Sequence, residues 1–422
     1  MTPPTTMLRT VAPDDIAPAR HAVDPATLVA AATIVQSVAD EGDAALRHHA
    51  ERLDALPKGA PLLLDRHALD AARDALPSDQ RALLERAADR IRRFAEAQRA
   101  ALTQITVPVP GGQAGHTISP VQAAGCYAPG GRYPLPSSVL MTAVTARAAG
   151  VQRVIVASPK PAPITLAAAS IAGADALLQV GGAQAIAALA HGTASIPHVD
   201  VIVGPGNKWV TAAKQLVVGT VGIDMLAGPS ELVVLADESA DPDLIAADLL
   251  AQAEHDPEAV PLLVTTSAPL VEAVEQALQA QLQTLPTAET ASAALQANGQ
   301  AVLCPHLEAA LDVCDRLAPE HLELMTASPE TLAPRLGHYG ALFIGPGAAE
   351  VLGDYATGPN HVLPTGGTAR YTGGLSALTF LRVRTWLQIT TPTKATPLAK
   401  DAAALADLEG HAAHAATARR RT

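Results

Sequence analysis

The sequence predicts an α/β protein with two Rossmann-like parallel-sheet domains, one inserted in the other, an N-terminal arm and a C-terminal helical tail. Two observations predict this fold. Short apolar runs, which are typical of buried parallel strands, alternate with alanine-rich helical stretches in two separate series. The 422 residues are 49% hydrophobic but only 2% aromatic, so the cores must be packed with aliphatic side chains.

The order of segments suggests how the domains are divided. Residues 1–25 are polar and proline-rich, and we expect an arm without a core of its own. Apolar residues at mixed three- and four-residue spacings then predict helices from residue 26 to about residue 101. We assign residues 26–121 and 229–372 to one discontinuous α/β domain. Residues 122–228 form the inserted domain.

Each series has its own predicted strands. In the inserted domain they are residues 151–157, 176–180 and 199–203. The later series has predicted strands at residues 232–236, 260–265, 301–304, 322–325 and 341–344. Strands that alternate with helices in this way predict parallel sheets with both faces covered.

The tail, residues 373–422, contains a turn, an extended run and an alanine-rich helix from Asp401 to Arg419. This helix has little apolar surface beyond its alanines, Leu405 and Leu408. We therefore expect it to dock on another surface, such as a second subunit.

Charge and cysteine content exclude several classes of function. A formal net charge of −12 argues against nucleic acid as a partner. The three cysteines, Cys126, Cys304 and Cys314, are widely separated, which fits a reducing compartment and excludes a cysteine zinc knuckle. Glycine and aspartate interrupt the longest apolar stretch, residues 164–190, so no membrane span is expected. We expect a soluble, cytoplasmic protein.

A predicted helix that begins at Asp241 and Pro242 ends in a candidate metal site. An acidic residue followed by proline is a strong helix start. At helical spacing, Gln252 and His255 project side by side, and an amide oxygen and an imidazole nitrogen can share one cation. The alternative is a solvated helix end.

Two glycine-containing turns follow successive predicted strands. One spans Gly204 to Lys208 and the other Gly181 to Gln184. Neither matches the GxGxxG or P-loop pattern, so simple tight turns are an alternative. Because ligands collect at the carboxyl ends of parallel strands, two such turns favour a ligand site. In the loop that starts at Cys126, a buried thiol is a more natural interpretation than a nucleophile.

Glu320 and His321 lie between a predicted helix and a predicted strand, because Pro319 disfavours helix at Ala318. An adjacent acid and imidazole supply two proton acceptors, suited to deprotonating an alcohol and activating water. A pair at a strand edge without catalytic function is the alternative.

Further candidate ligands lie nearer the C-terminus. Asp354 and His361 share one loop, and Asp354 would add an oxygen ligand to a site containing His255. On the terminal helix, spacing places His411 and His414 on one face, turned away from Glu409 unless Gly410 bends the chain. Spacing alone therefore favours His411 with His414 as a metal pair, or else a solvated helix face.

Taken together, these motifs resemble the histidinol dehydrogenase family from about Ala26 to the C-terminus. The resemblance rests on seven ordered segments: CYAPGGRYPLPSSVLMT, VDVIVGPGNKWVTAAKQLV, DMLAGPSELVVLAD, DLLAQAEHD, LAPEHLEL, GDYATGPNHVLPTGGTAR and EGHAAH. It implies a homodimer with intertwined subunits that oxidises L-histidinol to L-histidine through an aldehyde, with two NAD⁺ and a zinc ion.

The resemblance also implies a role for each matching residue. The zinc ligands would be Gln252, His255, Asp354 and His414. The last would come from the partner subunit, which makes residues 373–422 a dimerisation tail. Residues 122–228 would bind NAD, and the discontinuous domain would carry the catalytic and metal residues. Glu320 and His321 would be the catalytic pair. The substrate would be contacted by the four zinc ligands and His321, and also by Ser230, His361 and Glu409. NAD would be contacted by Tyr127, Gln184 and Asn207.

The resemblance favours His414 over the geometric pair, and His411 departs from the family pattern, as does the region from Leu378 to Val383. Two other functions stay open. A related zinc- and NAD-dependent enzyme could oxidise another primary alcohol, such as a sulfonated diol. A catalytically silent dimer could use the same four ligands only as a staple between subunits, although a staple has no use for Glu320 and His321.

Overall fold

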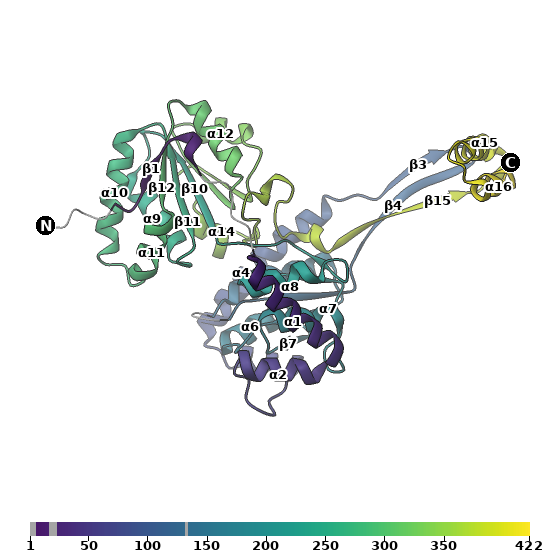
Figure 1. Cartoon of the computed structure of the whole chain (residues 1–422), viewed down its shortest axis with the longest axis horizontal. Helices are drawn as coiled ribbons and strands as arrows, with labels where there is room; N and C mark the ends of the chain where they lie inside the picture. Colours follow the sequence, from purple (N-terminus) through teal and green to yellow (C-terminus); the bar gives the residue numbers. More distant parts are fainter. Residues whose placement is uncertain (1–5, 17–22, 131–133) are drawn as a thin grey trace.

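Figure 1 shows a computed structural model of the chain, in which residues 6–16, 23–130 and 134–422 are described. Two α/β bodies lie next to each other, and a long arm extends from them with the C-terminus at its tip. The first body holds the sheet built from residues 63–65 and 123–223. The second body holds the sheet built from residues 9–11 and 231–344.

The first body contains a six-stranded sheet in the order β2-β7-β6-β5-β8-β9. All neighbouring strands are parallel except β2 and β7. Of the parallel strands, the first in sequence, β5, is central, and the next two lie on one side of it. The strands are β2 (Leu63–Asp65), β5 (Ala123–Tyr127), β6 (Arg153–Ala157), β7 (Ala176–Leu178), β8 (Val201–Val203) and β9 (Gly222–Ile223).

Helices cover both faces of this sheet. The first of them begins where the Asp24 carboxylate accepts a hydrogen bond from the Thr27 amide, with Pro25 in its first turn. One face is covered by α1 (Pro25–Glu41), α2 (Asp43–Leu53), α7 (Gly182–His191) and α8 (Lys208–Val217). The other face is covered by α3 (Arg66–Asp74), α4 (Ser78–Ala100), α5 (Pro136–Ala149) and α6 (Pro163–Ile171).

The second body repeats this strand order in an all-parallel sheet, β1-β12-β11-β10-β13-β14. Its strands are β1 (Arg9–Val11), β10 (Glu231–Ala236), β11 (Val260–Thr265), β12 (Gln300–Leu303), β13 (His321–Met325) and β14 (Ala341–Ile344). Helices α9 (Pro242–Ala253), α10 (Ala268–Leu282) and α11 (Ala288–Asn298) pack on one face, and α12 (Leu307–Leu317) packs on the other.

The structure confirms the α/β class with two parallel-sheet domains but corrects the predicted division of the chain. The helices between residues 26 and 101 pack on the first body, and β2 joins its sheet, so residues 26–121 share their core with residues 122–228 rather than with the sheet of residues 231–344. Val362, from the range 229–372, also joins this first core. Within the predicted N-terminal arm, residues 9–11 form β1, which pairs with β12, and Leu8 is buried in the second core. Helical spacing shows which face of a helix is apolar, but not which sheet that face covers.

The arm is an antiparallel sheet in the order β15-β4-β3, from β3 (Ile105–Val109), β4 (Gly112–Pro120) and β15 (Leu381–Ile389). At its tip, α15 (Pro392–Leu408) packs on α16 (Ala412–Arg419). The predicted tail boundary at residue 373 needs correction too, because Leu375, Ala377 and Phe380 are buried in the core of the first body.

The remaining short elements connect these units: η1 (Pro13–Asp15), α13 (Pro329–Leu332), η2 (Ala333–Arg335), α14 (Glu350–Tyr355), η3 (Thr368–Arg370) and η4 (Ala377–Phe380). In the described part of the chain, no helix combines the length and the apolar character needed to cross a bilayer. All three cysteines are buried free thiols, and burial raises the pKa of Cys126 to about 12, which confirms the buried thiol rather than a nucleophile.

Candidate active site

The candidate metal ligands of the second body lie at the amino ends of its strands. Helix α9 runs back across the sheet after β10, so its last turn brings Gln252 and His255 to the edge where β10 and β13 begin. Gln252 is completely buried, and neither its amide oxygen nor its amide nitrogen has a hydrogen-bond partner among the described residues. A buried amide without partners is rare unless a ligand completes it.

Glu320 and His321 are held by the backbone of one neighbouring residue. The Glu231 amide donates to Glu320 Oε2 at 2.9 Å, and His321 Nδ1 lies 3.0 Å from the Glu231 carbonyl oxygen. A carbonyl oxygen can only accept, so Nδ1 carries the proton and donates it. His321 Nε2 therefore keeps a free lone pair, and it has no hydrogen-bond partner among the described residues.

Burial sets the proton affinity of this pair in opposite ways. Burial lowers the pKa of His321 to about 3, so the imidazole is neutral and able to accept a proton. Burial raises the pKa of Glu320 well above its usual range, because the charged carboxylate loses water and the nearby Glu231 and Asp354 carboxylates repel it. Two bases of different strength thus share one site, as the sequence predicts.

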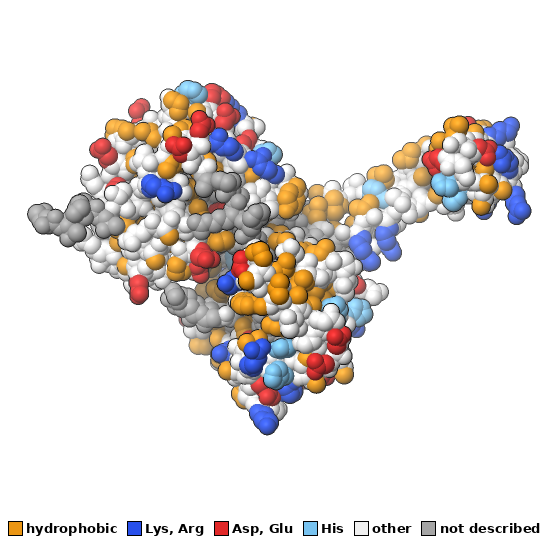
Figure 2. All heavy atoms as spheres, viewed as in Figure 1, with side chains coloured by type: hydrophobic (Ala, Val, Ile, Leu, Met, Phe, Trp, Pro, Cys, Tyr) orange, Lys and Arg blue, Asp and Glu red, His pale blue; other side chains and the backbone are white. Residues whose placement is uncertain are grey.

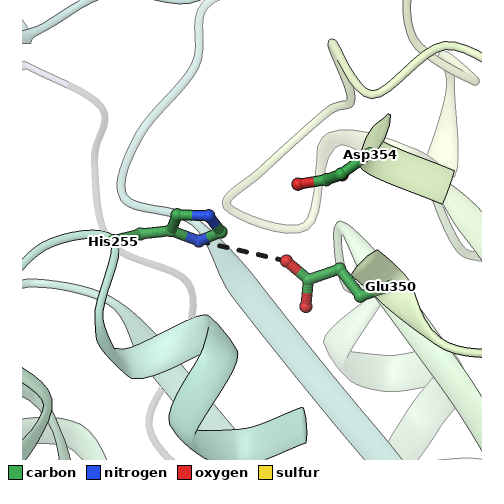
Figure 3. Close-up of side chains that lie close together, drawn as sticks. All are labelled: His255, Glu350 and Asp354. Atoms are coloured by element: carbon green, nitrogen blue, oxygen red, sulfur yellow. Dashed lines mark ion pairs between the residues drawn. The ribbon is translucent and has the colours of Figure 1, made fainter. Parts of the chain in front are cut away.

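The candidate ligand Asp354 joins His255 in one cluster, which also contains Glu350, a residue outside the predicted ligand set (Figure 3). The ligand atoms of the three residues lie within 4.8 Å of one another, and His255 Nδ1 is 4.0 Å from Glu350 Oε1. The Glu323 carboxylate fixes the start of α14 by accepting from the Glu350 amide at 2.7 Å. The spacing of Glu350 and Asp354, one helical turn apart, is the signal that would have found it.

These residues fit a divalent cation. Both carboxylate oxygens of Glu350 are buried without hydrogen-bond partners among the described residues. Burial raises the pKa of Asp354 to about 6, so the apo cluster disfavours its own negative charge. A bound cation would satisfy the carboxylates, the imidazole and the orphaned amide at once, and these are ligand types that zinc accepts.

Two other candidate substrate contacts lie at this edge. Ser230 directly precedes β10. His361 Nδ1 lies 3.1 Å from the carbonyl oxygen of Asp354, so it must donate there, and its Nε2 stays free to accept. Burial lowers the pKa of His361 to about 4.

The structure does not bring Glu409 and His414 to this site within one chain. His414 lies in α16, and Glu409 lies in the turn between α15 and α16, where Gly410 has a φ of 75° and ends the predicted single helix. Figure 1 shows the tip formed by these helices far from the second body. There, His411 Nδ1 is 3.2 Å from Glu409 Oε2, and the rings of His411 and His414 are 5.5 Å apart. In the described part of the chain, only His255, Glu350 and Asp354 form a possible metal group.

The three candidate NAD contacts come together at the carboxyl ends of the strands of the first body. Tyr127 ends β5, and its hydroxyl oxygen accepts from the Gly182 amide at 3.1 Å. Gln184 is buried in the first turn of α7. Asn207 caps α8 by accepting from the Trp209 and Val210 amides. Helix N-termini at this edge suit the phosphates of a dinucleotide.

A buried ion pair between two residues outside the predicted site holds the turn before Asn207. Lys214 Nζ donates to Asp224 Oδ1 at 2.5 Å and to the Gly204 carbonyl oxygen at 2.6 Å, and the Gly204 amide donates to Asp224 Oδ2 at 2.7 Å. Gly204 has a φ of 116°, and a Cβ there would lie 2.0 Å from the Tyr127 carbonyl oxygen. Only glycine fits this close approach.

The sequence model of the histidinol dehydrogenase family matches residues 19–422. The chain belongs to this family. It is 46% identical to histidinol dehydrogenase of Parasynechococcus marenigrum over 398 residues, covering 92% of this chain and 89% of the relative. It is 47% identical to that of Thermus thermophilus over 384 residues, covering 90% and 91%.

A solved histidinol dehydrogenase has the same fold. The crystal structure from Elizabethkingia anophelis aligns with a TM-score of 0.91 at 30% identity and covers 99% of this chain and 98% of that one. The chain is thus an oxidoreductase of histidine biosynthesis, which confirms the resemblance found in the sequence. These relatives do not favour the alternative of a dehydrogenase for another primary alcohol.

Proposed function

We propose that the chain oxidises L-histidinol to L-histidine, with two NAD⁺, in a zinc-anchored site that a second subunit completes. One observation carries this proposal. Four separate segments place a neutral imidazole with a free Nε2, a buried carboxyl group and a set of unsatisfied metal-type donors at one sheet edge. This arrangement suits a substrate that must be held by a metal and deprotonated beside it.

In this proposal, Gln252, His255 and Asp354 would hold the zinc ion together with His414 of the partner subunit. A zinc ion held there would supply a Lewis acid that anchors the imidazole and amino nitrogens of histidinol. Ser230, His361 and Glu409 complete the grip on the substrate. The free Nε2 of His361 gives that residue an acceptor for a substrate donor.

His321 accepts the proton of the substrate hydroxyl at Nε2 while a hydride leaves for the first NAD⁺. Two features support this role. The hydrogen bond from Nδ1 to the Glu231 carbonyl oxygen fixes the ring and its tautomer. The imidazolium that forms is stabilised by Asp354 Oδ1, 3.9 Å from Nε2, and by Glu350 Oε1, 3.9 Å from Nδ1.

Glu320 activates the water that hydrates the aldehyde, and the hydrate then gives a hydride to the second NAD⁺. The Glu231 amide holds Oε2, and Oε1 accepts no hydrogen bond from the described residues, so it is available to take a proton from water. Its raised pKa makes Glu320 a stronger base than an ordinary carboxylate.

The arm and its tip support a homodimer. Hydrophobic side chains are exposed along the arm (Figure 2), including Leu387 at 67% and, at the tip, Leu408 at 85%. Exposed apolar surface of this kind is typical of an interface. Because the tip cannot reach the site of its own chain in this structure, the tip of a second copy would supply His414 of the partner subunit. The cytoplasmic location stays a prediction, supported by the three free thiols.

The stoichiometry of the reaction tests the proposed function. Zinc-loaded protein is mixed with histidinol and NAD⁺, and NADH and histidine are counted in the same sample. We expect two NADH per histidine and no NADH with a sulfonated diol. If NADH forms with the diol and not with histidinol, the protein is instead a dehydrogenase for another primary alcohol. No NADH with any alcohol, together with dimer dissociation on chelation, would show a metal staple without catalysis.

A further inference from the structure

Asp54, which follows α2, is tied to the candidate NAD turn. Its Oδ2 accepts from the Gly181 amide at 3.0 Å and from Gln184 Nε2 at 3.0 Å. These partners are 127 and 130 residues further along the chain. Asp54 is 9% exposed, and its Oδ1 accepts no hydrogen bond from the described residues. One oxygen therefore orders the turn after β7, while the other is left available.

Dinucleotide-binding sheets usually carry an acid that this sheet lacks at the usual place. In such sheets the first three parallel strands bind the adenosine half, and an acid at the end of the second strand accepts from the ribose hydroxyls. Here the second strand, β6, is followed by Ser158, Pro159 and Lys160, none of which is acidic. Pro159 packs against the same turn, since a Cβ at Gly181 would lie 2.6 Å from Pro159 Cγ.

The cost of keeping Asp54 charged points to a functional reason for it. Burial raises the pKa of Asp54, although its two hydrogen bonds and the positive charge of Lys160 oppose this shift. A raised pKa means that the ionised group costs folding free energy at neutral pH rather than stabilising the chain. In the described part of the chain, no cation lies within ion-pair distance of Asp54 to offset this cost.

We propose that Asp54 accepts hydrogen bonds from the adenosine ribose of the dinucleotide through Oδ1, in place of the missing strand-end acid. This inference deepens the proposed function and rests on its use of NAD⁺. A carboxylate at this point would also repel a 2′-phosphate, so Asp54 selects NAD⁺ over NADP⁺. The lone Lys160 lies beside it but is not a substitute, because an ammonium group cannot accept from a hydroxyl.

The test measures binding of ADP-ribose, its 2′-deoxy analogue and its 2′-phosphate by calorimetry, without histidinol. The native protein should bind ADP-ribose about tenfold more tightly than either analogue, equal to about 1.4 kcal/mol. Asp54→Asn should bind ADP-ribose about tenfold more weakly. In this variant, the affinities for ADP-ribose, for its 2′-deoxy analogue and for its 2′-phosphate should become nearly equal. Because it removes a costly buried charge, Asp54→Asn should unfold at a temperature close to that of the native protein.

Asp43, the first residue of α2, provides a matched control at the other end of that helix. Its carboxylate accepts from the hydroxyls of Thr193 and Ser195, in the loop after α7, so it also joins α2 to the first body, but beyond the opposite end of α7. Asp43→Asn should leave all three affinities unchanged. Equal binding of ADP-ribose and its 2′-deoxy analogue by the native protein would overturn the inference even if Asp54→Asn fails to fold.

The failure of this inference is distinguishable from that of the proposed function. If histidinol yields two NADH per histidine but Asp54→Asn keeps the native ratio of affinities, the inference fails and the function stands. If the ratio of affinities changes as expected but histidinol is not oxidised, the proposed function fails and the inference about Asp54 stands.

Discussion

The two bodies share one strand order but use opposite edges of their sheets. In the first body, the candidate site lies at the carboxyl ends of the strands, where α7 and α8 begin. In the second body, it lies at the amino ends, where α9 stops and presents Gln252 and His255. Helix N-termini carry partial positive charge and helix C-termini partial negative charge. The same architecture therefore offers one edge to an anionic dinucleotide and the other to a cation.

The chemistry of the two edges differs accordingly. The first edge is built from backbone amides, glycines and hydrogen-bonded side chains, so most of its polar groups are already satisfied. The second edge is built from buried side chains that stay unsatisfied until a ligand arrives. Strand order and helix polarity are common to both bodies, so the side chains placed at each edge decide where a ligand binds.

The largest expected effect separates proton transfer from binding at the second edge. His321→Asn should lower alcohol oxidation by at least about a thousandfold, because the free Nε2 is the proton acceptor. Zinc content and ADP-ribose binding should not change, since neither involves Nε2. Initial rates and metal analysis check this, and a variant that oxidises histidinol normally would remove His321 from the reaction.

Removing the buried ion pair at the first edge should reduce the stability of the protein. Lys214→Met leaves Asp224 as an unpaired buried charge, and we expect the free energy of unfolding to fall by about 3–5 kcal/mol. The KM for NAD⁺ should rise, because Gly204 loses an anchor. Denaturant unfolding measures the effect, with Lys208→Met, an exposed position on the same helix, as the control. Equal stability of both variants would show that the pair does not hold the turn.

Glu320→Gln sharpens the division of labour within the second edge. The amide keeps the size of the side chain but cannot take a proton from water, so aldehyde oxidation should fall by about a hundredfold and alcohol oxidation by less. The two steps are measured separately by supplying histidinol or the aldehyde. An equal loss in both steps would exclude the assignment of water activation to Glu320.

The smallest expected effect concerns the tip of the arm. His414→Ala should weaken zinc binding by at least about tenfold, whereas His411→Ala, whose ring lies 5.5 Å from that of His414, should leave it nearly unchanged. Metal content after dialysis decides between them. If both variants keep their zinc, the second edge is complete within one chain and needs no partner.

Much of the core fold could be predicted because strand and turn signals are local. The predicted strands at residues 232–236 and 260–265 differ from β10 and β11 by one residue at most. What could not be predicted is which distant segments pair. Nothing in the sequence of residues 9–11 names β12 as a partner, and the spacing of Leu28 and Ile34 does not identify the sheet that α1 covers.

The candidate site shows the same division. The ligand types and the catalytic pair could be recognised from motifs. Glu350 could have been found from its position one helical turn before Asp354, but Asp224 acts through a buried contact that no motif records. Spacing on the terminal helix favours His411 with His414, and the structure places both at a tip that a single chain cannot bring to the metal group.

Anomalous scattering at the zinc edge from crystals of the zinc-loaded protein tests the central claim most directly. The account predicts one strong peak per site, about 2.0–2.2 Å from atoms of Gln252, His255 and Asp354 and from His414 of the partner subunit. A peak at the tip between His411 and His414, with none at the amino ends of β10 and β13, would contradict it.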